Sequence, residues 1–112
     1  MMEVGIWIGA MRADLGIPGA RSRKDRRQAV RRLVDRMRHR FEVSVHEVDD
    51  GSQWDRAVLA IATTGQDRRL IQSILDRCED LLDEPGNHVL NRIHSEVFMW
   101  QNKEGLDKTT FY

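Results

Sequence analysis

The hydrophobic periodicity of this chain switches repeatedly between two values, and the order of the switches restricts the fold more than any other feature. Four segments have the alternating or continuous apolar pattern of β-strands: residues 2–10, 41–49, 56–64 and 89–100. Two segments carry apolar stripes at spacings of three and four residues, as in amphipathic helices: residues 22–40 and 67–84. The predicted order is strand, helix, strand, strand, helix, strand.

This order predicts an α+β protein with a ferredoxin-like βαββαβ fold. Each strand–helix–strand unit makes a right-handed crossover, and a turn at residues 49–52 joins the two units. We expect a four-stranded antiparallel sheet with two helices on one face. Because 112 residues is close to the commonest domain size, residues 1–100 are expected to form a single domain. Residues 101–112 are polar before a final Phe-Tyr and are expected to form a C-terminal tail.

Both predicted helices begin at a residue suited to capping. Ser22 and Asp67 precede the two stripes, and such side chains accept hydrogen bonds from the free N–H groups of a first turn. The stripes predict the helical part of the core: Val30, Leu33, Val34, Met37, Leu70, Ile71, Ile74, Leu75, Cys78, Leu81 and Leu82. The single cysteine lies in the second stripe, where it is expected to pack as a small apolar side chain.

Alternation in the first strand predicts which side chains lie on the open face of the sheet. Ile6, Ile8 and Ala10 share one side of this strand, and Trp7 lies on the other. We expect Trp7 to lie on the sheet face away from the helices. An exposed apolar patch usually marks an interface, so we expect self-association through an open-face patch, which would make the protein a homo-oligomer. The predicted interface residues are Trp7, Leu59, Ile61, Phe98 and Trp100.

The charge of the chain is zero in total but very unevenly distributed. Residues 21–40 contain ten basic and two acidic residues, a local charge of +8, and the rest of the chain carries −8. This split produces a strong local field despite the neutral sum. Cations in the first turn of a helix oppose its macrodipole, so they do not stabilise the helix itself.

The basic helix indicates binding to a polyanion, and RNA or a ribosomal subunit is the expected partner. Arginine contacts phosphate with two parallel hydrogen bonds, and counterion release then drives the affinity. The predicted nucleic-acid-binding residues are Arg21, Lys24, Arg27, Arg31, Arg32, Arg36 and Arg38. The alternative is a solvated helix surface whose charges pair with acidic residues of the second helix, such as Glu79 and Asp80. A second alternative is a self-associating interaction module without a nucleic-acid ligand.

Other functional classes have little support in the sequence. Ser44 and His46 are two residues apart on a strand, which is awkward for a direct hydrogen bond, and there is no nucleophile-elbow motif, so we expect no enzyme. The four histidines lack helical pairing, and one cysteine makes no zinc site, so we expect neither a metal nor another cofactor. The longest apolar run is too short to span a bilayer, and we expect a cytoplasmic protein without a membrane partner.

Part of the chain resembles a known family. The resemblance is carried by Ser-Arg-Lys-Asp-Arg-Arg at 22–27, by Phe-Glu-Val-Ser-Val-His-Glu-Val-Asp at 41–49, and by Trp54. This pattern is similar to the YlxP-like proteins, small bacterial domains of unknown function. The resemblance implies the ferredoxin-like fold, and because no catalytic residues are established for such proteins, it supplies none to carry over. Since the genes of such proteins tend to lie beside those for translation initiation factor two and ribosome-binding factor A, it also implies a role near the ribosome.

Overall fold

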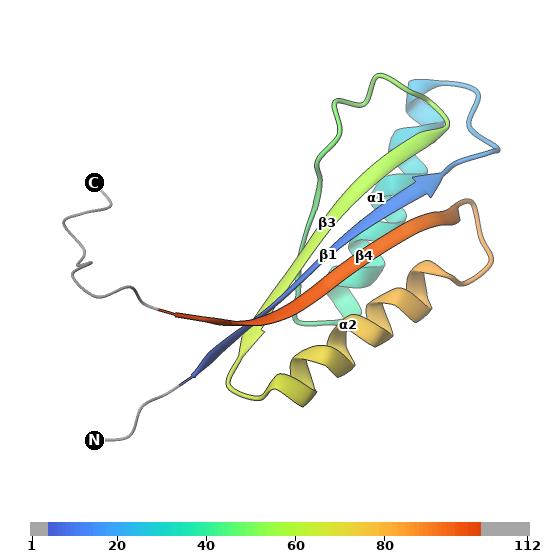
Figure 1. The fold of residues 1–112 in the computed structure, drawn as a ribbon. Coiled ribbons are helices and arrows are strands. Elements are labelled where there is room, and N and C mark those ends of the chain that lie inside the picture. Colours follow the sequence, from blue (N-terminus) through green and yellow to red (C-terminus); the bar gives the residue numbers. More distant parts are fainter. Residues whose placement is uncertain (1–4, 102–112) are drawn as a thin grey trace.

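A computed structural model describes residues 5–101 and shows the expected α+β architecture. The elements are β1 (Ile6–Gly16), α1 (Arg23–Arg40), β2 (Ser44–Glu47), β3 (Arg56–Gly65), α2 (Arg68–Leu82) and β4 (Val89–Trp100). The strands form one antiparallel sheet in the order β2-β3-β1-β4, and both helices lie on the same face of it (Figure 1). The ferredoxin-like fold is confirmed. Apart from Gln101, the predicted tail lies outside the described residues.

Both helix starts are capped as predicted. The Ser22 hydroxyl accepts a hydrogen bond from the Asp25 N–H at 3.1 Å, and the Asp25 carboxylate accepts one from the Arg21 N–H at 3.1 Å. At α2, the Asp67 carboxylate accepts a hydrogen bond from the Arg69 N–H at 2.9 Å. These contacts satisfy N–H groups that a helix cannot pair internally, and they fix where α1 and α2 begin.

β1 extends to Gly16, beyond the predicted end at residue 10. The side of this strand that faces the helices is the opposite of the predicted one. Met11, Ala13 and Leu15 are buried toward the helices, whereas Arg12 is exposed on the other side. Because side chains alternate along a strand, Trp7 also lies on the helix side. The prediction that Trp7 lies on the open face is therefore wrong. Its ring is half-buried and lies 5.9 Å from the Arg68 guanidinium carbon.

The predicted positions of Leu59 and Ile61 on the open face are wrong as well. Leu59 is 0% exposed and Ile61 2% exposed, because odd-numbered residues of β3 face the helices. Phe98 and Trp100 do lie on the open face, where they stand opposite Ile8 and Ile6 of β1. These four side chains are the open-face apolar patch of the described structure.

α2 packs closely against the sheet at a glycine. A Cβ atom added at Gly9 would lie 2.7 Å from Cγ2 of Ile71 and 3.1 Å from Cδ1 of Leu75. The apolar stripe of α2 is buried as predicted, except that Ile74 is half-buried and Leu70 is 57% exposed. Cys78 is buried in this stripe, and burial raises the pKa of its thiol to about 11. In the part of the chain that the structure describes, no helix has the length and apolarity needed to cross a membrane.

Candidate polyanion-binding surface on α1

The basic residues of α1 fall into two groups that the sequence did not distinguish. The first group is exposed and forms no ion pair with any other residue between 5 and 101: Arg21, Lys24, Arg27, Arg31 and Arg32, from the predicted site, and Arg23. All of them lie before residue 33. The exposed cations that the protein does not engage are therefore concentrated at the N-terminal part of α1 and at the residue preceding its cap.

The second group is engaged by the protein itself. The Arg36 guanidinium pairs with the Glu84 carboxylate at 2.8 Å, and that of Arg40 approaches the same carboxylate at 3.9 Å. Arg38 donates a hydrogen bond to the carbonyl of Val45 in β2, at 2.5 Å. Pairing with acidic residues near α2 thus occurs, but through Glu84, in the turn after this helix. Two of the predicted binding residues, Arg36 and Arg38, have structural partners.

One flank of α1 forms the wall of a groove along β2. Lys24, Arg27 and Arg31 share this flank, since spacings of three and four residues bring side chains to the same side of a helix. Arg27 and Arg31 line a hollow of about 300 Å³ together with Val30, Val34, Asp35, Arg38 and Glu47. Apolar carbon forms part of this groove, and guanidinium groups border it on the helix side.

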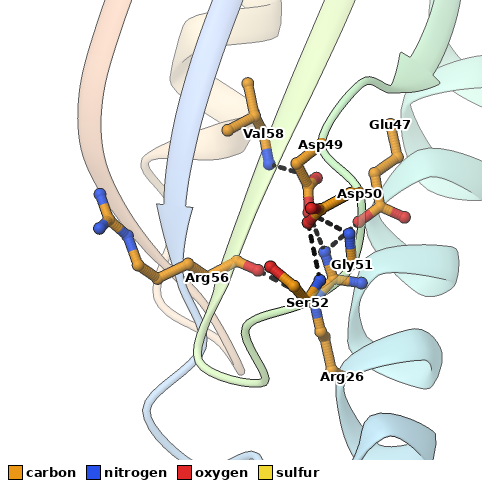
Figure 2. A network of polar contacts seen from close by, with 8 residues as sticks. All are labelled: Arg26, Glu47, Asp49, Asp50, Gly51, Ser52, Arg56 and Val58. Atoms are coloured by element: carbon orange, nitrogen blue, oxygen red, sulfur yellow. Dashed lines mark hydrogen bonds and ion pairs between the residues drawn. The ribbon is translucent and has the colours of Figure 1, made fainter.

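Arg26 lies among these cations along the chain, although not in the predicted binding set, and it does not belong to the charged surface. Its side chain is buried, and the residue is only 6% exposed. Figure 2 shows it reaching from α1 toward the segment that connects β2 to β3. Nε donates a hydrogen bond to the carbonyl of Arg56 at 2.9 Å, and Nη2 contacts the carboxylates of Glu47 and of Asp49, the latter at 2.5 Å. We call Arg26, Glu47 and Asp49 the arginine clasp.

Asp49 connects the clasp to the backbone of the β2–β3 connection. Its carboxylate accepts hydrogen bonds from the N–H of Val58 at 2.9 Å and from that of Gly51 at 3.0 Å (Figure 2). Gly51 has φ +73°, a conformation that favours glycine. The turn is thus held by one carboxylate that also binds the buried guanidinium.

The two carboxylates of the clasp have pKa values shifted in opposite directions. The pKa of Glu47 is raised, mainly because burial disfavours its charge, and Arg26 offsets only part of this effect. The pKa of Asp49 is lowered: burial acts to raise it, but the N–H of Val58, Glu47, the N–H of Gly51 and the charge of Arg26 together outweigh burial. Asp49 therefore carries the more stable negative charge.

The sequence does contain a signal for the clasp. Arg26 lies four residues before Val30 and seven before Leu33, so it falls on the apolar stripe of α1. A cation on a buried stripe requires a charged partner. The partner carboxylates also occur in the Glu-Val-Asp string at 47–49, which is one of the segments that carry the family resemblance.

Ser44 and His46, which the sequence analysis considered for catalysis, do not meet the nearby carboxylate of Asp49. Asp49 is bound to Arg26 on the helix side of the sheet, while Ser44 and His46 line a shallow hollow of about 430 Å³ that also contains Ala60, Ala62, His94 and Glu96. His46 and His94 lie on β2 and β4, the two edge strands of the sheet. Among residues 5–101, no three histidine, cysteine, aspartate or glutamate side chains are grouped so that they could hold a metal ion.

Comparison with known proteins places this fold in a family. The sequence profile of the DUF503 family, described as proteins of unknown function, matches residues 8–95. The chain belongs to this family. No curated protein matches the chain significantly.

Similar solved structures share only low sequence identity with the chain. The de novo designed protein Foldit4 is 18% identical, with a TM-score of 0.42, and the match covers 88% of this chain and 99% of the designed one. A C-terminal segment of the alpha subunit of aIF2 from Pyrococcus abyssi is 19% identical, with a TM-score of 0.40, over 92% of this chain and 54% of that one.

Proposed function

We propose that this protein binds structured RNA, with a ribosomal subunit as the first partner to test, through the N-terminal part of α1. The observation that carries the proposal is the group of exposed cations that no other described residue pairs: Arg21, Arg23, Lys24, Arg27, Arg31 and Arg32. An exposed helix that serves only solubility normally mixes both charge signs. Unpaired cations of one sign on a rigid support are what phosphate binding requires.

The position of these cations supports the proposal further. Arg23 and Lys24 lie in the first turn of α1, where the macrodipole disfavours positive charge. The helix is capped by Ser22 and buries an apolar stripe, so it does not need these charges for its stability. Their presence favours a ligand over a structural role.

The mode of recognition that fits is contact with the phosphate backbone. The open face of the sheet carries Ala10, Ala60 and Ala62 at its centre, and these offer no aromatic ring on which a base could stack. The flank of Lys24, Arg27 and Arg31 instead presents a row of cations along one helix. Such a row recognises the shape and charge of RNA with little selection among bases.

The resemblance to YlxP-like proteins supports the choice of a ribosomal partner. The genes of those proteins tend to lie beside genes for translation factors. In this proposal the protein is a non-enzymatic RNA-binding domain of the cytoplasm. Arg36 and Arg38 contribute less than the flank residues, because Glu84 and the Val45 carbonyl already engage them.

The test is a salt series of binding to purified small ribosomal subunits and to a bare structured RNA. The variant combines Lys24→Gln, Arg27→Gln and Arg31→Gln. The matched control combines Arg68→Gln, Arg69→Gln and Arg77→Gln on α2, which changes the net charge by the same amount. If three phosphate contacts are lost, the slope of log affinity against log salt should flatten by about 2 to 3 in the α1 variant only. Equal binding by both variants would contradict the proposal, as would a wild type that binds neither RNA nor subunits at physiological salt.

A further inference from the structure

β4 exposes a long row of unpaired backbone groups at the edge of the sheet. The Trp7 carbonyl accepts a hydrogen bond from the Thr64 hydroxyl at 3.0 Å, and the Ile17 N–H donates to the Asp55 carbonyl at 2.7 Å. Odd-numbered residues of β1 and its continuation therefore direct their backbone toward β3, and even-numbered ones toward β4. Since Arg12 stands opposite His94, the backbone of even-numbered β4 residues faces β1. The backbone N–H and C=O groups of Ile93, Ser95 and Val97 therefore point away from β1, toward the free edge of the sheet.

Nothing in residues 5–101 covers this edge. No described side chain or loop makes a hydrogen bond to the outward groups of Ile93, Ser95 or Val97. β4 is 12 residues long, and its last part is apolar. In Figure 1 the end of β4 and the start of β1 both extend beyond the helices. A long edge strand of this kind is a template for pairing with another strand.

The side-chain pattern of β4 is complementary to itself when two copies run antiparallel about Ser95. Ile93 of each copy then stands opposite Val97 of the other on the helix side. On the open face, His94 stands opposite Glu96 and Arg92 opposite Phe98. These are apolar, acid–base and cation–aromatic pairs, each of which stabilises neighbouring strands. Three other centres are less complementary. A centre at Glu96 would place Glu96 opposite itself, and a centre at Ile93 would place Arg92 opposite His94. A centre at His94 would pair Arg92 with Glu96, but it would place His94 opposite itself and Ile93 opposite the polar Ser95.

We infer that the protein forms a two-fold symmetric dimer by antiparallel pairing of β4 with β4 of a second copy, centred on Ser95. The result is a continuous eight-stranded sheet, because each copy contributes the four strands of its own sheet. The formal net charge of zero removes long-range repulsion between the copies. β2 lies at the far edge of each sheet, so the α1 surfaces stay at the outer ends. The inference is independent of RNA binding.

Cross-linking tests both the interface and its register. Residues that face each other in a hydrogen-bonded antiparallel pair have Cα atoms about 5.5 Å apart, which suits a disulfide. Ser95→Cys should therefore give a covalent dimer under mild oxidation, with twice the 13.1 kDa mass of the chain. Ser44→Cys, in the edge strand β2, is the matched control and should stay monomeric. The native thiol at Cys78 is buried, so the wild-type protein measures the background level of cross-linking. Faster cross-linking by His94→Cys than by Ser95→Cys would overturn the register.

A proline at the same position tests the non-covalent dimer. The N–H of Ser95 points outward, so Ser95→Pro removes no hydrogen bond of the monomer. In the dimer it removes the central pair of backbone bonds, and the dissociation constant should rise about tenfold or more by analytical ultracentrifugation. His94→Pro is the control that disrupts the sheet itself.

Two results would overturn the inference. The first is a wild-type protein that stays monomeric at every concentration. If such a monomer still protects the Ser95 amide from hydrogen exchange, an intramolecular contact and not a second copy covers the edge of β4. The second is a dimer that Ser95→Pro leaves intact, which would place the contact on the open sheet face or at β2.

Discussion

Among residues 5–101 one edge of the sheet is protected and the other is not, and this distinguishes the half that contains α1 and β2 from the half that contains α2 and β4. β2 is 4 residues long, and the Arg38 side chain donates a hydrogen bond to the Val45 carbonyl on the outer edge of this strand. β4 is 12 residues long, and no described group occupies its edge. Short edge strands with charged side chains are a common protection against unwanted pairing. The contrast indicates that one edge is closed to partners and the other is open.

The two halves also differ in the contacts that hold their helices to the sheet. α1 and β2 are joined by the arginine clasp, a polar network that buries a cation. α2 packs on β1 through apolar side chains at a glycine. Polar networks depend on charge and pH, whereas apolar packing depends on volume. Substitutions that remove a charge should therefore mainly destabilise the contact of α1 with β2. Substitutions that change side-chain volume should mainly destabilise the contact of α2 with β1.

The largest effect is expected from breaking the clasp. Arg26→Met leaves the carboxylates of Glu47 and Asp49 without a counter-charge and detaches the β2–β3 connection from α1. The free energy of unfolding should fall by about 3 kcal/mol, the lower end of the range for a broken buried pair, because the carboxylates remain partly hydrated. Denaturant unfolding measures the change. Arg23→Met, on the exposed side of the first turn, is the control, and equal losses from both variants would show that the clasp is not special.

The apolar half should respond to added volume instead. Gly9→Ala brings a Cβ atom within 2.7 Å of the Ile71 side chain, so α2 has to move or repack. We expect a loss of about 2 kcal/mol in the free energy of unfolding, typical of overpacking. Gly19→Ala is the matched control, since nothing lies within 4 Å of an added Cβ there. A stable Gly9→Ala variant would show that the contact between α2 and β1 is loosely packed.

The polar half should show a titration at acid pH that is centred on the clasp. The folded-state pKa of Asp49 lies below its ordinary value of 3.8, so its charge stabilises the fold above that pH, and this contribution is lost as the pH falls. Glu47, with a raised pKa, acts in the opposite direction and offsets part of the effect. Asp49→Asn should cost about 1 to 2 kcal/mol at neutral pH. The difference from wild type should shrink below pH 3.8. Thermal unfolding across this pH range, with Asp35→Asn as control, decides whether Asp49 is the group that titrates.

The fold was predictable from the sequence because its determinants are local. Ser22 and Asp67 cap the helices that they precede, and the apolar stripes identify the buried side of each helix. The orientation of β1 was not recovered, because the predicted strand stopped at residue 10. The alternation of Met11, Arg12, Ala13 and Asp14 shows which side faces solvent, and it lies beyond that point.

The candidate site was predicted only in part. Which cations of α1 are free and which are engaged depends on contacts with residues that are distant in the sequence. Arg26 lies among other cations, and its partners are 21 and 23 residues away along the chain. Arg36 has a partner 48 residues away. Helical spacing places a side chain on a flank, but it does not show which cation the rest of the protein engages.

The smallest effect is expected at the ion pair that joins the two halves. Arg36 and Glu84 are 2.8 Å apart, but their side chains are 49% and 45% exposed. Water and salt screen such a pair, so Arg36→Gln should lower the free energy of unfolding by less than about 1 kcal/mol. Its effect on RNA binding should also be smaller than that of Arg31→Gln, because Glu84 already neutralises the Arg36 guanidinium. Single substitutions compared in the same binding assay measure this difference. Equal losses of affinity would mean that RNA displaces Glu84, and the binding surface would then extend along α1 to the side that faces α2.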